Sequence, residues 1–96
     1  MACLEIIEIR AVGSNRELLE SQLQFLSKEL NQHKDLQAVK VYKRVMLETD
    51  FSIHLFHNSE KADSGCISIC TQLIPSLKDF GLVNHTIWID NLKGDN

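Results

Sequence analysis

The order of two kinds of apolar periodicity along the chain is the feature that most constrains its fold. Four segments, at 3–12, 36–46, 51–57 and 82–90, alternate apolar and polar residues or are rich in β-branched residues, as β-strands are. Two others, at 15–34 and 64–80, carry apolar residues three and four positions apart, which is typical of an amphipathic helix. The sequence therefore predicts the order strand, helix, strand, strand, helix, strand.

Cap and turn residues mark the ends of the two predicted helices. Ser14 and Glu17 have the spacing of a capping box, in which each side chain bonds the backbone amide of the other residue. Pro75 predicts either a kink in the second helix or a restart with Pro75 in its first turn. Gly81 is expected to end that helix, because glycine adopts a positive φ without strain.

With right-handed crossovers, this order of elements folds into a four-stranded antiparallel sheet with both helices on one face. We therefore predict an α+β, ferredoxin-like βαββαβ fold. The chain of 96 residues is long enough for one domain and too short for two, so the domain spans 1–96, with a polar tail at 91–96. The first and third strands are expected at the centre of the sheet.

Composition excludes several classes of partner. Ten basic against thirteen acidic residues give a net charge of −3, which excludes a strongly basic nucleic-acid-binding protein and offers no attraction to an anionic membrane. No apolar run approaches the ~18 residues that span a bilayer. The N-terminal segment has no basic leader, and three cysteines are too few for a disulfide scaffold. We therefore expect a cytoplasmic protein with reduced cysteines.

The alternation along each strand also assigns residues to the two faces of the sheet. The helix-facing side is predicted to be the more apolar, with Ile7, Ile9, Val39, Val41, Ile53, Leu55, Val83, Ile87 and Ile89. The other side is predicted to carry Tyr42, Met46, His54, Phe56, Thr86 and Trp88. Nothing in the chain remains to cover these rings, and an apolar patch with a polar rim marks an interface. A symmetric homodimer with the sheets packed face to face is predicted; the alternative is a monomer with scattered surface aromatics.

Three local phrases of the sequence are similar to those of a known family. Residues 41–44 (Val-Tyr-Lys-Arg) are similar to its second strand, 50–60 to its third strand leading into the second helix, and 77–89 to its last helix and strand. The chain thereby resembles, over nearly its whole length, the antibiotic-biosynthesis monooxygenase-like proteins of the dimeric α/β-barrel superfamily. The resemblance implies a homodimer that forms an α/β barrel, with a ligand pocket between each sheet and its helices.

The resemblance also implies a range of activities. Some members of the family are cofactor-free oxygenases of quinol-like aromatic molecules, and others bind and degrade haem. Haem-acting members are expected to carry an Asn in the first strand, a Trp at the end of the third and a His on the second helix, and this chain has none of them at 4–12, 56–57 or 64–80. We therefore expect no cofactor, and a monooxygenase acting on a small aromatic or quinol-like substrate. The alternative is a non-catalytic ligand-binding or regulatory dimer, whereas an RNA-recognition domain would need stacking aromatics on its first strand, which has none.

Three residues are the candidates for catalysis. His54 and Tyr42 lie on neighbouring strands of the second face, where such a pair can orient a phenolic substrate or move a proton. The alternative for His54 is a hydrogen bond within the dimer interface. His57 is predicted on the helix-facing side at a strand end, where it would line a pocket. A closed apolar cavity there would favour the enzyme, and a solidly packed interior would favour the non-catalytic module.

Other residues are predicted to have supporting or structural roles. Phe56, Trp88 and His85 are candidates for the ligand pocket or the dimer interface, with Trp88 as a packing anchor and His85 nearer the surface. The cysteines at 66 and 70 lie one helical turn apart and form either half of a metal site or ordinary packing. No metal is expected, because the remaining ligands of a four-coordinate site are not in view. Glu5 and Glu8, three apart on a strand, face opposite sides and do not form a carboxylate pair.

Overall fold

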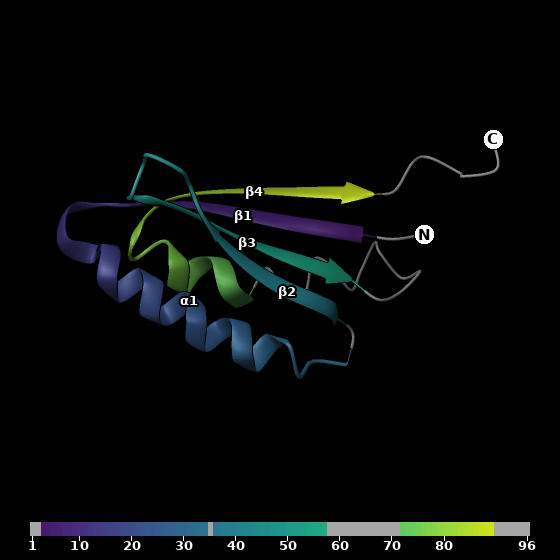
Figure 1. Ribbon diagram of the computed structural model, residues 1–96. Helices are drawn as coiled ribbons and strands as arrows, with labels where there is room; N and C mark the ends of the chain where they lie inside the picture. The colour runs from purple at the N-terminus through teal and green to yellow at the C-terminus, as the bar shows by residue number, and fades with distance from the viewer. Residues whose placement is uncertain (1–2, 35, 58–71, 90–96) are drawn as a thin grey trace.

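The computed structural model describes residues 3–34, 36–57 and 72–89, and it has the predicted order of elements. These elements are β1 (Cys3–Ala11), the short helix η1 (Gly13–Asn15), α1 (Arg16–Leu30), β2 (Leu36–Lys43), β3 (Asp50–His57), a helical stretch over 72–77, and β4 (Gly81–Ile89). The antiparallel sheet has the order β2-β3-β1-β4, so the predicted central position of β1 and β3 is confirmed (Figure 1). The predicted second helix before residue 72 and the polar tail lie outside the described residues.

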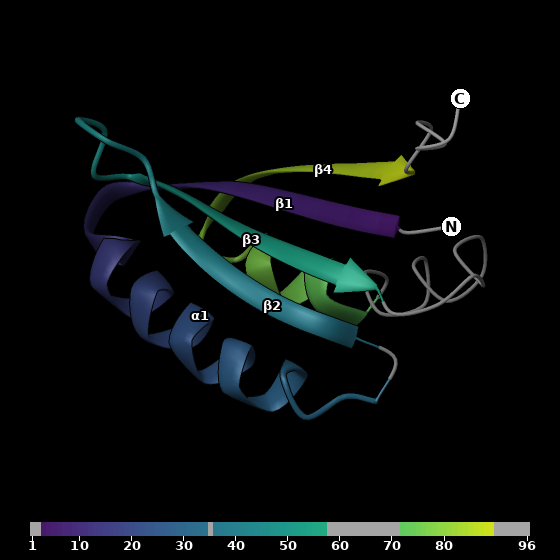
Figure 2. The same ribbon diagram turned by 45° about the vertical axis from the view of Figure 1, so that its right-hand side comes forward.

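One layer of apolar side chains joins the sheet to its helical segments, which lie on the same side of it (Figure 2). Alternate residues of β1 and β3 point toward this side and are buried, as a period of two requires. The buried side chains are Ile7, Ile9, Ala11, Leu19, Leu23, Leu26, Leu36, Val39, Phe51, Ile53, Leu55, Leu73 and Leu77. Since fully burying a side chain of leucine size contributes about 2 kcal/mol, this layer fixes which face of each strand turns inward.

The opposite side of the sheet, here called the outer face, is not covered by the described residues. Its members follow the strand register, and Phe56, Leu4 and Trp88 are neighbours across β3, β1 and β4. Tyr42 and Trp88 are 46% and 57% exposed. The predicted placement of these aromatic residues on a face away from the helices is therefore confirmed.

The connection between β2 and β3 differs from the predicted one. β2 ends at Lys43, and Val45 and Met46 are 83% and 91% exposed at the hairpin tip. The Arg44 amide donates to the Asp50 carbonyl at 3.0 Å and closes the turn. Met46 has a φ of 69°, which residues other than glycine rarely adopt. The prediction of Met46 as part of the apolar outer face is therefore wrong, because the chain has already left the sheet at that position.

β2 contains a bulge near its start. Leu36 pairs with His57 and Ala38 pairs with Phe56, so two steps along β2 oppose one step along β3. Gln37 is the extra residue, and it is exposed. A bulge of this kind re-aims a side chain at the rim of a sheet.

Gly81 is required for a reason other than the predicted one. Among the described glycines only Gly13 has a positive φ, of 61°. Gly81 is the first residue of β4 and pairs with Ala11 of β1. A Cβ atom at this position would lie 1.9 Å from the carbonyl oxygen of Arg10, so only glycine lets the two strands approach this closely.

Two further predictions need correction. The capping box does not form: α1 begins without a side-chain cap, and Asn15 donates its Nδ2 to the Phe80 carbonyl at 3.3 Å. Ile87 and Ile89 lie on the predicted side of β4 but are 41% and 46% exposed. Since β4 is an edge strand, the described helical residues cover it near Val83, which packs against the core, and leave its far end open.

Candidate functional site

A carboxylate lies in the core on the helix-facing side of the sheet. Glu5, on the central strand β1, is completely buried. Removing an isolated carboxylate from water is costly, so a buried one needs polar partners. Those partners come from the strands on either side, His57 from β3 and His85 from β4.

Each oxygen of Glu5 contacts one histidine. His57 Nε2 lies 2.5 Å from Glu5 Oε1, and His85 Nε2 lies 3.0 Å from Glu5 Oε2. The His57 side chain is 5% exposed and that of His85 is 24% exposed. We assign the hydrogen atoms from this pattern: an ionised carboxylate accepts, so each ring donates its Nε2–H and keeps Nδ1 as the acceptor nitrogen. Glu5, His57 and His85 are called the buried triad below.

The buried triad is a set of hydrogen bonds and not a metal site. The two rings face different oxygens of Glu5, so their nitrogen atoms do not converge on one point. Within the described part of the chain, no group of three His, Cys, Asp or Glu side chains could hold a metal ion. The predicted side of the sheet is confirmed for both histidines, and His85 is three-quarters buried rather than a surface residue.

A hollow of about 250 Å³ opens beside His57, at the end of the sheet where β1 begins and β3 and β4 end. Its described lining is mostly apolar and comprises Cys3, Leu4, Gln37, Phe56, His57, Trp88 and Ile89. Gln37, the extra residue of the bulge in β2, is part of this lining. This lining combines aromatic and aliphatic side chains with one histidine and one glutamine.

His54 and Tyr42 lie apart from this hollow, on the outer face. Their ring centroids are 4.7 Å apart with the planes at 62°, so the predicted pairing of these two residues is confirmed. His54 Nε2 lies 3.2 Å from the Ser52 hydroxyl. Burial lowers the pKa of His54, and the nearby Glu8 carboxylate opposes that shift in part. Trp88 is on β4, which is separated from the β3 strand of His54 by β1. Trp88 therefore does not form one site with His54 and Tyr42 within a single chain.

Protonation of His54 is expected to destabilise the folded protein. Its pKa in the folded state is below the ordinary value of 6.5, so the unfolded chain takes up this proton first as the pH falls. The contribution of His54 to the free energy of unfolding is therefore complete above pH 6.5 and is lost as the pH drops through the folded pKa. His54→Gln should remove this component from the pH dependence of urea unfolding, measured at a fixed protein concentration. A variant with the pH dependence of the wild type would contradict the assignment.

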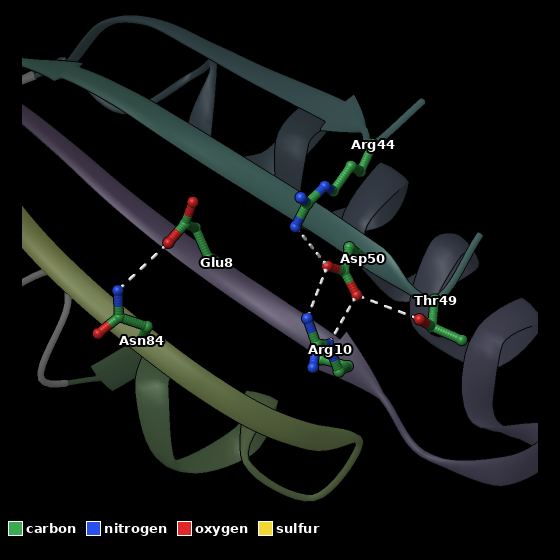
Figure 3. Close-up of polar contacts among 6 residues, drawn as sticks. All are labelled: Glu8, Arg10, Arg44, Thr49, Asp50 and Asn84. Atoms are coloured by element: carbon green, nitrogen blue, oxygen red, sulfur yellow. Dashed lines mark hydrogen bonds and ion pairs between the residues drawn. The ribbon is translucent and has the colours of Figure 1, made fainter. Parts of the chain in front are cut away.

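A polar cluster occupies the other end of the outer face (Figure 3). Arg10 Nε donates to Asp50 Oδ1 at 3.0 Å, and Arg44 Nη1 donates to Asp50 Oδ2 at 3.2 Å. These bonds, chiefly those from Arg10, lower the pKa of Asp50. The cluster lines an open hollow of about 660 Å³ that also includes Tyr42 and Asn84. Both arginines are more than half exposed and already share one carboxylate, so the ion pairs stabilise the fold little and we assign no catalytic group here.

Cysteine chemistry differs from the prediction. Cys3 is buried and disulfide-bonded, whereas reduced thiols were expected. A disulfide at Cys3 is at odds with the reducing setting from which a cytoplasmic location is predicted. The cysteines at 66 and 70 lie outside the described residues, and so does the metal half-site considered for them.

Glu5 is the functional candidate that the sequence reasoning missed. Glu5 and Glu8 face opposite sides of β1, as predicted, so they do not form a carboxylate pair. The contact of Glu5 with histidines on the neighbouring strands was not predicted. The signal was present in the strand alternation. Glu5, His57 and His85 all fall on the helix-facing side, and the predicted strand order already placed β1 between β3 and β4.

Solved structures share this architecture over nearly their whole length. Rv0793 from Mycobacterium tuberculosis has a TM-score of 0.78 at 9% sequence identity, covering 98% of this chain and 99% of that one. A variant of SnoaB from Streptomyces nogalater, a cofactor-independent oxygenase, has a TM-score of 0.73 at 7% identity, covering 99% and 98%. A protein described as an antibiotic biosynthesis monooxygenase has a TM-score of 0.70 at 14% sequence identity, and the match covers 97% of this chain and 100% of that one. The chain has the fold of these proteins.

The resemblance noted from the sequence is thereby confirmed at the level of the fold. At 7–14% identity, a shared fold establishes architecture and not a reaction. No protein-family model matches the chain, and no curated protein matches it in sequence. No helix within the described ranges is long and apolar enough to cross a bilayer.

Proposed function

We propose that the protein is a homodimer that binds a small aromatic or quinol-like molecule in the hollow beside His57 and acts on it as a cofactor-free monooxygenase. The observation that carries the proposal is the position of His57. His57 lines the hollow, and its Nε2 is hydrogen-bonded to the buried Glu5 carboxylate. The shared fold with SnoaB, described as a cofactor-independent oxygenase, supports the reaction class.

A cofactor-free oxygenation requires few functional groups from the protein. In a cofactor-free oxygenation the substrate supplies the electrons that reduce oxygen, so the site must bind, orient and deprotonate it. Phe56 and Trp88 provide an aromatic wall, the Gln37 amide provides an orienting group, and His57 provides a base. His54 and Tyr42 are proposed as a second contact, which meets the ligand if it extends to the outer face.

The homodimer is proposed from the outer face. Tyr42 and Trp88 are about half exposed there, and Lys40 Nζ lies 5.8 Å from the centre of the Phe56 ring, which gives this surface the aromatic centre and polar rim of an interface. Pairing two such faces creates the dimeric α/β barrel. Sedimentation equilibrium at micromolar concentration should show a particle of twice 11.0 kDa, and a lone 11.0 kDa particle would reject the dimer.

A non-catalytic ligand-binding or regulatory dimer is the second candidate. Both described hollows are open, and the layer around Ile7, Ile53 and Leu55 between the sheet and its helical segments is completely buried. A solidly packed interior favours this alternative. In this alternative the ligand still binds in the hollow, but the protein does not catalyse its reaction with oxygen.

Oxygen consumption with a panel of quinols separates the two candidates. The monooxygenase should turn over at least one quinol, and His57→Gln, which keeps a donor for Glu5, should lower the rate by roughly 100-fold, as loss of a general base does. His54→Gln is the matched comparison on the outer face, and a greater loss there would move the site to His54 and Tyr42. Absence of turnover across the panel, with the quinols still bound, would establish the non-catalytic alternative.

A further inference from the structure

We infer that the buried triad is a proton-accepting site for a weakly acidic hydroxyl group, a phenol or an enol, and that Glu5 is the residue that positions its histidines. The inference rests on the proposed use of the hollow as the ligand site. It adds the chemical group that the site recognises, the atom that receives its proton, and a residue that the sequence did not single out.

Burial is the first observation that carries the inference. Glu5 is completely buried, and the His57 side chain is 5% exposed. Apolar residues of similar volume in place of a buried ionic pair often leave a fold equally or more stable. The stability of the fold therefore does not require a carboxylate at this point of β1. A carboxylate is required to hold two imidazole rings in fixed orientations.

The pairing of each histidine ring with its own oxygen of Glu5 is the second observation. With the hydrogen atoms assigned as above, His57 donates its Nε2–H to Glu5 Oε1, which leaves the lone pair of the neutral ring on Nδ1. His85 holds the second oxygen at 3.0 Å and prevents the carboxylate from rotating. His57 is also the histidine that lines the hollow. The triad thus presents one proton-accepting ring to a bound ligand.

The proton transfer balances without a further reactant. The O–H bond of the ligand breaks and an N–H bond forms at His57 Nδ1, which gives the ligand anion and an imidazolium. No electron is transferred. His57 Nε2 lies 2.5 Å from Glu5 Oε1, so the negative charge of that buried carboxylate would stabilise the imidazolium. Glu5 is the charged group that contacts His57 among the described residues, so its charge sets this stabilisation.

The test uses the full chain and 4-nitrophenol, whose anion absorbs visible light and whose acid form does not, under anaerobic conditions. Binding to the wild type should lower the pH at which the probe ionises by roughly one unit, as a suitably placed charge does. Glu5→Gln should abolish most of this shift, because the amide carries no charge and turns an N–H toward one of the rings. Glu8→Gln makes the same change on the outer side of the same strand and should keep the full shift.

A measurement on the wild type guards against a Glu5→Gln variant that does not fold. Nitrogen-15 NMR should show the Nε2–H tautomer for His57 and His85, with protonation of His57 Nδ1 when the probe binds. An Nδ1–H tautomer of free His57, a probe whose ionisation does not change on binding, or a full shift in folded Glu5→Gln would each overturn the inference. Because oxygen is absent, a probe shift in a protein that never consumes oxygen would support this inference and reject the monooxygenase.

Discussion

Replacing His57 with leucine is expected to lower the free energy of unfolding by about 3 kcal/mol. Leucine fills a similar space but cannot donate a hydrogen bond to Glu5 Oε1. The variant therefore keeps a completely buried carboxylate with one partner instead of two. Urea unfolding at neutral pH and fixed protein concentration measures the loss.

A second substitution distinguishes this cause from simple loss of packing. Adding Glu5→Leu to His57→Leu removes the stranded charge, so the double variant should recover roughly 2 kcal/mol, because replacing both partners by apolar groups costs less than replacing one. The remaining His85 is 24% exposed and can reach water. Two substitutions whose effects simply add would show that Glu5 and His57 are not coupled.

Replacing Gly81 with alanine is expected to be about as destabilising, by roughly 3 kcal/mol. The new Cβ would lie 1.9 Å from the Arg10 carbonyl oxygen and 2.8 Å from its carbonyl carbon, both of them backbone atoms that no side-chain rotation can move. β4 must therefore separate from β1 at its first residue. Urea unfolding should show the loss, and hydrogen exchange should show weaker protection of amides near the start of β4.

Gly13→Ala is the matched control for that prediction. Gly13 has a φ of 61°, and a Cβ there would meet no atom within 4 Å. The cost is then conformational alone, about 1 kcal/mol. If Gly81→Ala proved no more destabilising than Gly13→Ala, the close approach of β1 and β4 would not be what requires glycine at 81.

Strand alternation and element order were sufficient to predict the sheet. They placed β1 and β3 at the centre, Tyr42 beside His54, and both His57 and His85 toward the helices. These features follow from a period of two and from chain connectivity, which are local properties of a sequence. Their agreement explains why a fold can be recognised when 7–14% of residues are shared with the solved structures.

The features that were not predicted depend on contacts between distant segments. The need for glycine at 81 comes from the Arg10 carbonyl on another strand, and the position of Gln37 comes from a register shift against β3. The role of Glu5 requires two histidines that are 52 and 80 residues away in the chain. Single-residue patterns identify the face on which each group lies, but not which groups meet there.

The extra residue on β2 has a consequence for how copies of the chain can associate. A regular edge strand offers an unbroken ladder of amide and carbonyl groups, along which further strands add without limit. At Gln37 this ladder is interrupted, so an incoming strand aligned with one half of β2 is out of step with the other half. Fibre-like growth through this edge is therefore disfavoured.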